Sequence, residues 1–359
     1  MSTDTAGGRP VAIVAAAQTP AYAAFDGPEP VMIMRCVTEL LAATGLERAD
    51  LEFTIAGSCD NLSGAPFAFV MNIDGVGAWP PVYESHVEMD GAWALFEAWL
   101  RLQVGDIDVA LVIGSGKSSP GRHDEVFPLQ TDPYTAAPLG LDPASVAGLQ
   151  ARALVDAGLA SERAFAEVVA RSLADATSNP HALVAGEHAV DDLLAAPYST
   201  APLRRHDRSA IADGAAAVVL VAGDRARELT DTPVWIAGMD HRIDSHHLGL
   251  RDLTDSPSTR LAAAGAGVGD RPVDVAELMV THSCEEIVLR AALGLEGDGT
   301  RINPSGGPLA GDPVMATGLV RVVEAAARVA AGEAGRAVAH ATSGPALQQN
   351  LVCVLEGAA

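Results

Sequence analysis

The sequence predicts an α/β protein built from two related halves. Hydrophobic residues make up 49% of the 359 residues but aromatic residues only 4%, which favours a large core of alanine, valine and leucine. A helix over 92–104 is followed by a glycine and a strand over 108–114. The same order recurs when a helix ending near 331 is followed by glycines and a strand over 337–340. A weak internal repeat of this kind is typical of a duplicated unit.

The first half begins with a strand over 11–17 that is apolar on both faces, as in a sheet covered by helices. Apolar residues at helical spacing follow over 31–44, and a second strand lies around Ile55. Cys59 comes directly after that strand, a position where a nucleophile is conceivable. We expect no helix with a small-residue turn after it, so we interpret Cys59 as a buried structural cysteine.

The rest of the first half contains a long insertion. Residues 82–91 lead into the helix over 92–104, which precedes the strand over 108–114. We predict that 115–205 form an excursion of loops and helices, with helices near 145–157 and 161–176. A strand over 213–220 closes the half, so we place the first half at 1–225 and the second at 226–359.

The stretch 302–318 organises the second half. Its first part is too rich in glycine and proline for a regular element, and its second part opens an apolar run. It therefore predicts a tight loop that leads into a buried helix, with Asp312 as the cap and Pro313 in the first turn. Upstream, a strand over 277–281 is followed by a helix that begins near Thr281.

Charge and cysteine usage exclude several classes of partner. The net charge is −23, with 46 acidic residues against 23 basic ones, so we expect no nucleic acid and no anionic membrane as direct partners. Four cysteines without a paired CxxC motif, and the lack of a signal pattern or a membrane-length apolar run, predict a cytoplasmic protein. The histidines His241, His246 and His247 have poor metal-ligand spacing, so we expect no metal.

Several motifs resemble the thiolase superfamily. The stretch Asn303-Pro304-Ser305-Gly306-Gly307, then Gly311-Asp312-Pro313, then Met315-Ala316-Thr317-Gly318 resembles the C-terminal signature Asn-Pro-x-Gly-Gly, Gly-His-Pro, Gly-Ala-Thr-Gly. The segments Asn179-Pro180-His181-Ala182, Pro202-Leu203-Arg204 and Asp213-Gly214-Ala215-Ala216-Ala217 resemble the sterol-carrier-type branch, also called lipid-transfer proteins. The resemblance covers about 10–357. It implies two pseudo-symmetric βαβαβαββ halves arranged in five layers, αβαβα.

The reactive positions implied by this resemblance are altered. Glu88 stands where the family has its nucleophilic cysteine and Asp312 where it has its catalytic histidine, and either Ser343 or Thr342 stands near the second cysteine. No cysteine occurs between 60 and 283, so ordinary thiolysis is disfavoured, although a carboxylate can act as a general base. His282 resembles the histidine of the family's His-Asp-Cys-Phe segment, which helps to bind the reacting oxygen. Backbone amides near Gly344 are candidates for holding an oxyanion.

Three functions remain open on these residues. The first is retro-aldol cleavage of a β-hydroxyacyl-CoA, as in steroid and lipid side-chain degradation, which needs proton transfer but no nucleophile. The second is a non-catalytic thiolase-type subunit, and the third is an acetyl-CoA acetyltransferase. Two carboxylates at the altered positions favour acid–base chemistry.

The resemblance also implies a substrate class and an assembly. We expect a coenzyme A thioester as substrate and no bound cofactor. We expect at least a dimer, with a second copy or a thiolase homologue, paired through the edge strand of the first half. A small OB-fold (DUF35-type) protein is a further expected partner.

Overall fold

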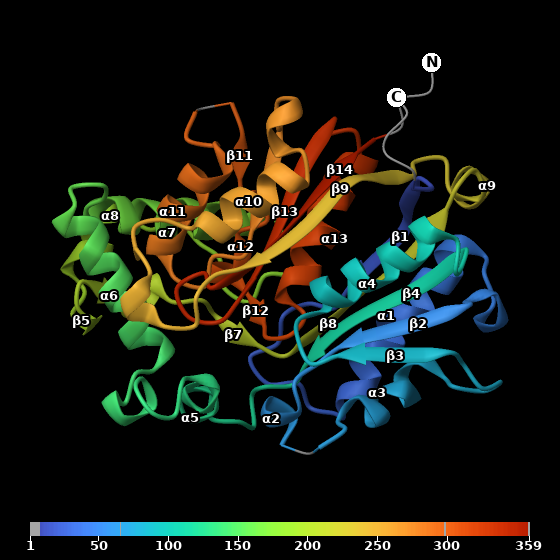
Figure 1. Cartoon of the computed structure of the whole chain (residues 1–359), viewed down its shortest axis with the longest axis horizontal. Helices are drawn as coiled ribbons and strands as arrows, with labels where there is room; N and C mark the ends of the chain where they lie inside the picture. The colour runs from blue at the N-terminus through green and yellow to red at the C-terminus, as the bar shows by residue number, and fades with distance from the viewer. Residues whose placement is uncertain (1–7, 65, 298, 358–359) are drawn as a thin grey trace.

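The computed structural model describes residues 8–64, 66–297 and 299–357 (Figure 1). The strands are β1 Val11–Gln18, β2 Phe53–Gly57, β3 Glu84–Val87, β4 Val109–Gly116, β5 Tyr198–Thr200, β6 Leu203–Arg204, β7 Ile211–Ala212, β8 Gly214–Ala222, β9 Val234–Ile243, β10 Val275–Leu278, β11 Arg301–Ile302, β12 Asp312–Pro313, β13 Arg336–Ser343 and β14 Gln349–Glu356. The α-helices are α1 Glu29–Thr44, α2 Asp60–Ser63, α3 Phe69–Val76, α4 Gly91–Val104, α5 His123–Val126, α6 Pro143–Asp156, α7 Glu162–Asp175, α8 Val190–Ala195, α9 Arg225–Leu229, α10 Pro257–Gly265, α11 Ser283–Leu293, α12 Gly307–Ala310 and α13 Thr317–Ala330.

The two halves have the same strand pattern. One sheet runs in the order β11-β10-β13-β14-β9-β1-β8-β4-β2-β3. In the first half β2 is parallel to β3 and β4, and β8 is antiparallel to β4 and β1. In the second half β10 is parallel to β11 and β13, and β14 is antiparallel to β13 and β9. The predicted pseudo-symmetric βαβαβαββ halves are therefore confirmed. Their sheets join where Ala12 and Ile13 of β1 pair with Trp235 and Val234 of β9.

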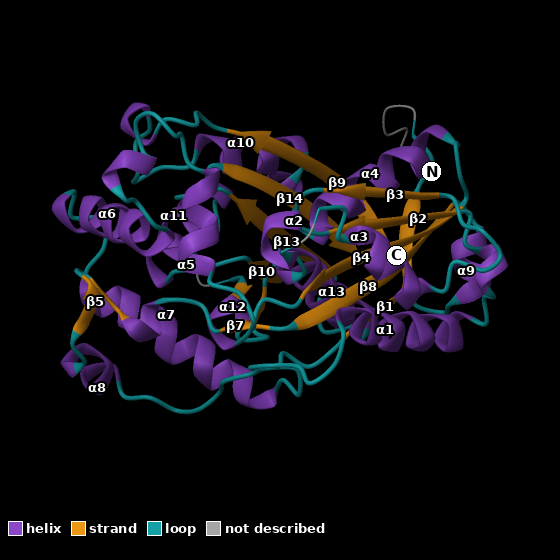
Figure 2. Ribbon diagram, turned by 90° about the horizontal axis from the view of Figure 1, so that it is seen from below, coloured by secondary structure: helices purple, strands orange, loops and turns teal. Residues whose placement is uncertain are grey.

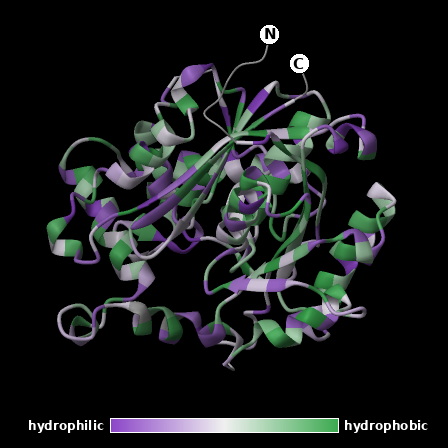
Figure 3. Cartoon of the chain, turned by 45° about the vertical axis from the view of Figure 1, so that its right-hand side comes forward, coloured by the Kyte–Doolittle hydropathy of each residue, from purple (hydrophilic) through white to green (hydrophobic). Residues whose placement is uncertain are grey.

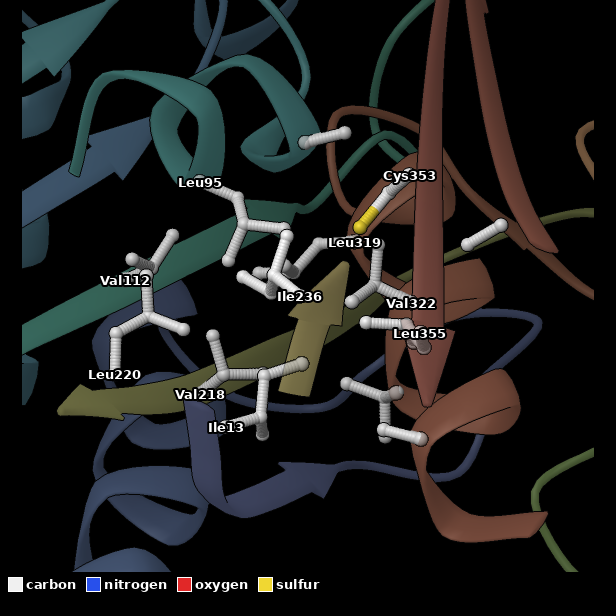
Figure 4. Packing of buried hydrophobic residues seen from close by; sticks show 14 of the residues in the cluster. Ile13, Leu95, Val112, Val218, Leu220, Ile236, Leu319, Val322, Cys353 and Leu355 are labelled. Atoms are coloured by element: carbon white, nitrogen blue, oxygen red, sulfur yellow. The ribbon is translucent and has the colours of Figure 1, made fainter. Parts of the chain in front are cut away.

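Three buried clusters show the predicted layers. A central cluster contains residues of α4 and α13 together with residues from strands of both halves, and Figure 4 shows Leu95, Leu319 and Val322 meeting there. A second cluster packs α1 against β1, β4 and β8. A third packs α10, α11 and α6 against β10, β13 and β14. Burial of these apolar side chains is the main force that holds the five layers together.

Glycine allows the central helices to lie very close to the strands. A Cβ on Gly91, the first residue of α4, would lie 2.7 Å from the Cα of Gly114 in β4. Real side chains do not reach such distances, so any larger residue at Gly91 would push the helix away from the sheet. The outer helices carry hydrophobic and hydrophilic stretches together, as amphipathic helices do (Figure 3).

The predicted excursion lies between β4 and β8. Its helices α6 and α7 match the helices predicted near 145–157 and 161–176. Figure 2 shows α6, α7 and α8 gathered at one end, away from α1 and α9. The boundary between 225 and 226 stays a prediction. Within the described residues, no helix has both the length and the apolar character that a bilayer crossing requires.

Two local predictions are wrong. Asp312 does not cap the helix that follows it, because α13 begins at Thr317 and Asp312-Pro313 instead pair with β7 as the short strand β12. The Asp312 carboxylate is occupied by two side-chain hydroxyl groups. Cys59 is in fact followed by a helix, because it is the N-cap residue of the one-turn α2, which ends at Gly64.

Candidate active site

One carboxylate joins the N-termini of the two central helices. Asp90 is the N-cap residue of α4, and its Oδ1 accepts the N–H of Ala92 at 2.8 Å. The same carboxylate accepts the N–H groups of Gly318 at 2.9 Å and Leu319 at 3.1 Å, both in the first turn of α13. The N–H of Gly91 also donates to the carbonyl of Met315 at 2.9 Å. The helix starts that the sequence singled out separately therefore meet at one point.

Burial raises the pKa of Asp90 to about 6, although hydrogen bonds from the N–H groups of Ala92, Gly318 and Leu319 oppose that rise. The negative charge of Asp312 raises the pKa of Asp90 further. The positive ends of both helix dipoles favour the charged form of Asp90. Asp90 is 3% exposed, and its acceptor sites face backbone N–H groups, so we interpret it as a structural cap.

Asp312 is a buried carboxylate held by two hydroxyl groups. Thr317 Oγ1 donates to Asp312 Oδ1 and Ser209 Oγ donates to Asp312 Oδ2, each at 2.5 Å. Thr317 is fully buried, whereas Ser209 is half-buried. Asp312 itself is only 4% exposed, so Ser209 is its more accessible neighbour.

Ser209 also connects Asp312 with His282. The N–H of Ser209 donates to the carbonyl of Thr281 at 2.7 Å, and the adjacent Arg208 forms an isolated antiparallel bridge with His282. The predicted residues Asp312 and His282 are therefore brought together through one short segment. The sequence offered no signal for Ser209, because the contact exists only after β7 and β12 have paired.

His282 is buried at the start of α11, with 6% of its surface exposed. Its Nδ1 lies 3.2 Å from Thr281 Oγ1 and 3.7 Å from Glu285 Oε1. Its Nε2 is buried and has no hydrogen-bond partner within the described part of the chain. Glu285 accepts the backbone N–H groups of Thr281 at 2.7 Å and His282 at 3.0 Å. Glutamate three residues after the N-cap is a sequence signal for a helix start, so Glu285 could have been found.

The segment around Glu88 lies at the exposed side of the site. Glu88 Oε1 accepts the N–H of Asp60 at 2.6 Å, and the side chain is exposed. Burial raises the pKa of the neighbouring Cys59 thiol, and the charge of Glu88 raises it further. Cys59 is 4% exposed, so both its burial and its pKa agree with the interpretation as a structural cysteine.

The turn between β13 and β14 completes the candidate site. Ser343 is the last residue of β13, is half-buried, and pairs with Gln349. Gly344 follows with a φ of 75°, in the left-handed region that favours glycine. The N–H of Thr342 approaches Met279 Sδ at 3.4 Å, three residues before His282. The side-chain amide of Gln349 approaches Met89 Sδ at 3.8 Å, which places this turn beside the Glu88 segment.

Behind these residues lies a buried ion pair. Glu277 Oε2 accepts from Arg321 Nη1 at 2.7 Å and from Ser305 Oγ at 2.6 Å. Arg321 also donates to Ser305 Oγ at 2.7 Å. The strand β10, the loop that contains Ser305 and the helix α13 are therefore fixed to one another. Asn303 adds a further link, because its Oδ1 accepts the N–H of Leu278 at 2.5 Å. This cluster gives the glycine- and proline-rich motif a rigid base.

The described residues contain no group of three or more His, Cys, Asp or Glu side chains that could hold a metal ion. The chemistry that these residues themselves offer is acid–base chemistry: two buried groups, Asp312 and His282, and one exposed carboxylate, Glu88. Sequence reasoning identified all three but missed Ser209, Thr281 and the capping role of Asp90.

Comparison with known proteins gives a consistent picture. The sequence matches no family model. The chain is 28% identical to an "Acetyl-CoA acetyltransferase" of Methanothermobacter thermautotrophicus, over 91% of this chain and 92% of that protein. It is 27% identical to the "Benzoylsuccinyl-CoA thiolase subunit BbsB" of Thauera aromatica, over 44% of this chain and 47% of that protein.

Solved structures show the same fold. The structure of human mitochondrial 3-ketoacyl-CoA thiolase superposes with a TM-score of 0.77 and 17% identity, covering 98% of this chain and 99% of the other. A structure described as "Ltp2-ChsH2(DUF35) aldolase" superposes with a TM-score of 0.79 and 20% identity, covering 97% of each chain.

Proposed function

We propose that this chain, whose thiolase fold and relatives support a place in the thiolase superfamily, cleaves a β-hydroxyacyl-CoA by a retro-aldol reaction. The observation that carries the proposal is the joining of Asp312 and His282 through Ser209, together with a segment before α4, residues 84–90, that contains no cysteine. A site with positioned proton-transfer groups and no thiolate suits a reaction that needs no covalent intermediate.

Retro-aldol cleavage makes two demands on a site. A base removes the proton of the β-hydroxyl group, the Cα–Cβ bond breaks, and the β-carbon leaves as a carbonyl. The electron pair passes to the α-carbon and the thioester oxygen as an enolate, which hydrogen-bond donors stabilise. Asp312, His282 and Glu88 are the groups for proton transfer. The backbone amides of the turn at Ser343 and Gly344 are the oxyanion donors of the proposal.

The relatives support the substrate class and leave the reaction open. Both curated relatives are named for CoA thioesters, and one structural neighbour is named an aldolase, whereas the other names are those of thiolases or an acetyltransferase. The sterol-carrier-type branch and a role in steroid or lipid side-chain degradation belong to this proposal. A cytoplasmic location is also part of this proposal. It is supported by the four free, buried cysteines, because unpaired thiols are usual in a reducing compartment.

We further propose that the chain works in an assembly. One relative is named as a subunit, and the aldolase neighbour is named together with a DUF35 protein. Strand β3 ends the sheet, so one side of it is an edge, and Trp79, five residues before β3 in the chain, is 83% exposed. Such an edge is stabilised when another chain covers it. A second copy, a thiolase homologue or an OB-fold protein of the DUF35 type would be the partner.

The test is cleavage of a β-hydroxyacyl-CoA by the chain co-purified with its natural partners. We expect a shorter acyl-CoA and a carbonyl product, and losses of roughly 10²–10⁴-fold for Asp312→Asn and His282→Gln. Asp231→Asn, on an exposed residue before β9, serves as the control and should keep parental turnover. Parental turnover in all the variants would make this chain a non-catalytic subunit. Thiolysis of a β-ketoacyl-CoA by free CoA would instead establish an acyltransferase.

A further inference from the structure

We propose that Glu285, Thr281 and His282 form a hydrogen-bonded relay that makes His282 Nε2 the general base of the cleavage. Glu285 is the positioning residue of this relay, acting on the imidazole through the Thr281 hydroxyl. The inference rests on the proposed function, and it assigns the base among the groups that the proposal leaves open.

The distances show that Thr281 is the link. His282 Nδ1 and Glu285 Oε1 are 3.7 Å apart, which is too long for a direct hydrogen bond. Thr281 Oγ1 lies between them, 3.2 Å from Nδ1 and 3.0 Å from Glu285 Oε2. A carboxylate has no proton to give, so the single hydroxyl proton of Thr281 goes to Glu285. The Thr281 oxygen is then the acceptor, and the proton of the neutral imidazole resides on Nδ1.

This tautomer leaves the lone pair on His282 Nε2. That nitrogen is buried and unpartnered within the described part of the chain. Leaving a buried polar atom without a partner is destabilising, so its presence at this point favours a site that a ligand group completes. A hydroxyl group of a substrate is the kind of partner that a lone pair on nitrogen takes.

Glu285 is charged at neutral pH. Burial tends to raise the pKa of Glu285, but contacts with His282 and the N–H of Thr281 bring it below its usual range. The carboxylate is 5% exposed and therefore poorly screened by water. A fixed negative charge across one hydroxyl stabilises the imidazolium that forms when Nε2 accepts a proton from the substrate.

The other charged groups near His282 are engaged elsewhere. Arg208, which is paired with His282 through its backbone, carries its charge near Asp142. Asp207 accepts from Ser283 Oγ at 2.6 Å and from the N–H of Arg204. On the α7 side of α11, Glu286 pairs with Arg171. Asp312 accepts a hydrogen bond from the Ser209 hydroxyl group, and Ser209 links it to the segment of His282.

The charge of Glu285 also acts on a second imidazole, that of His340, but His340 does not compete with His282 for the substrate proton. Burial lowers the pKa of His340 to about 4, so its ring is neutral at physiological pH. Asn350 donates its side-chain amide to Ser258 Oγ and to the carbonyl of Leu347, each at 2.8 Å. The Asn350 oxygen therefore faces His340 Nε2 at 2.9 Å and accepts its proton. His282 is left as the imidazole that takes up a proton beside Glu285.

The step balances on this chain alone. Nε2 takes the β-hydroxyl proton as the Cα–Cβ bond breaks and the new carbonyl forms. The imidazolium, stabilised by Glu285 across Thr281, then returns the same proton to the α-carbon of the enolate. The products are a carbonyl compound and a shorter acyl-CoA, with no oxidant or co-reactant consumed.

The first test needs no activity. Nitrogen NMR of the ¹⁵N-histidine-labelled full chain, with the His282 signal assigned from His282→Gln, should show neutral His282 protonated on Nδ1. Glu285→Gln keeps the acceptor for the N–H groups of Thr281 and His282 but removes the charge, so the pKa of His282 should fall. Thr281→Val, which lacks the hydroxyl group, should have the same effect. Thr281→Ser keeps the hydroxyl group and should behave like the parent chain. Glu286→Gln, the matched neighbour, should leave the titration of His282 in place. An Nε2–H tautomer, or a titration that Glu285→Gln does not move, overturns the relay.

The second test uses turnover. In Glu285→Gln, kcat should fall about 10–100-fold with little change in KM, and the acidic limb of the kcat profile should move to lower pH. Parental turnover in Thr281→Ser, together with reduced turnover in Thr281→Val, separates a relay from a packing role. Parental turnover in His282→Gln would overturn the relay even if the NMR result holds. If the parent chain cleaves no β-hydroxyacyl-CoA while the NMR result holds, the proposed function fails and the hydrogen-bonded relay stands.

Discussion

Asp90 Oδ2 accepts the N–H of Gly318 at 2.9 Å, across a separation of 228 residues. Because the same side chain caps its own helix through Ala92, one carboxylate serves the N-termini of both α4 and α13. Those two helices form the central layer, and the predicted site residues precede them: Glu88 lies two residues before Asp90, and Asp312 lies five residues before the start of α13. The relative placement of Glu88 and Asp312 therefore depends on Asp90.

Replacing Asp90 by asparagine should change how stability depends on pH. Since burial raises the pKa of Asp90 from 3.8 to about 6, the native chain binds more protons than the unfolded chain between these values. Stability from this group is present below pH 4 and is lost as pH rises through 6, about 3 kcal/mol in all and about 1 kcal/mol between pH 5 and 7.5. Asp90→Asn cannot titrate and lacks this loss. Urea unfolding of both proteins at pH 5 and 7.5 measures the difference. An advantage of the parent over the variant that stays constant with pH would contradict the assignment.

At Gly116 the two halves of the chain meet at backbone distance. A Cβ at Gly116 would lie 1.8 Å from the carbonyl oxygen of Val314 in the motif stretch. Gly116→Ala must displace that backbone, and we expect a loss of about 1–3 kcal/mol or more in unfolding free energy. Gly269→Ala is the control, because a Cβ there meets nothing within 4 Å, and it should stay within about 0.5 kcal/mol. Equal stability of the two variants, measured by urea unfolding, would sink the prediction.

The Glu277–Arg321 pair should be costly to break. Both side chains are buried, and burial raises the pKa of Glu277 while Arg321 opposes the rise. Glu277→Gln preserves size but leaves the Arg321 charge without its carboxylate, so we expect about 3–5 kcal/mol of destabilisation. Asp156→Asn breaks an exposed pair with Arg152 and should cost less than about 1 kcal/mol. Thermal and chemical unfolding of the two variants provide the comparison; a similar small cost for both would show that the buried pair is dispensable.

No acyl-enzyme should form on this chain. Burial raises the pKa of both Cys59 and Cys284, so neither thiol is readily ionised, and the segment before α4, which contains Glu88, has no cysteine. Incubation with acetyl-CoA followed by intact mass spectrometry should show no adduct of acetyl mass. Alkylation of the unfolded chain should label the four free cysteines and confirms that the assay detects modification. An acetyl group mapped to Cys59, Cys284 or Ser343 would revive the acyltransferase alternative.

Local pattern was enough to predict many of the long elements of the core. Runs apolar on both faces gave the strands, because a residue buried in a covered sheet must be apolar whatever its partner. The helix–glycine–strand repeat predicted the two halves, since duplicated units keep the same order of elements and turns. The sequence also predicted Asp312 as a site residue, because the glycines and prolines around it fix the register of the motif.

Only the tertiary structure decided what these side chains touch. Asp312 stands beside a proline and reads as a cap, yet two hydroxyl groups occupy its carboxylate, one from Ser209, which is 103 residues away. The cap of α13 comes instead from Asp90, in the other half. Propensities describe a residue and its near neighbours, whereas a carboxylate in a buried layer takes whichever donors the packing brings within 3 Å. The sequence by itself predicted many of the core elements and shows no cysteine between residues 60 and 283; the folding of the two halves onto each other decided the hydrogen bonds that these side chains make.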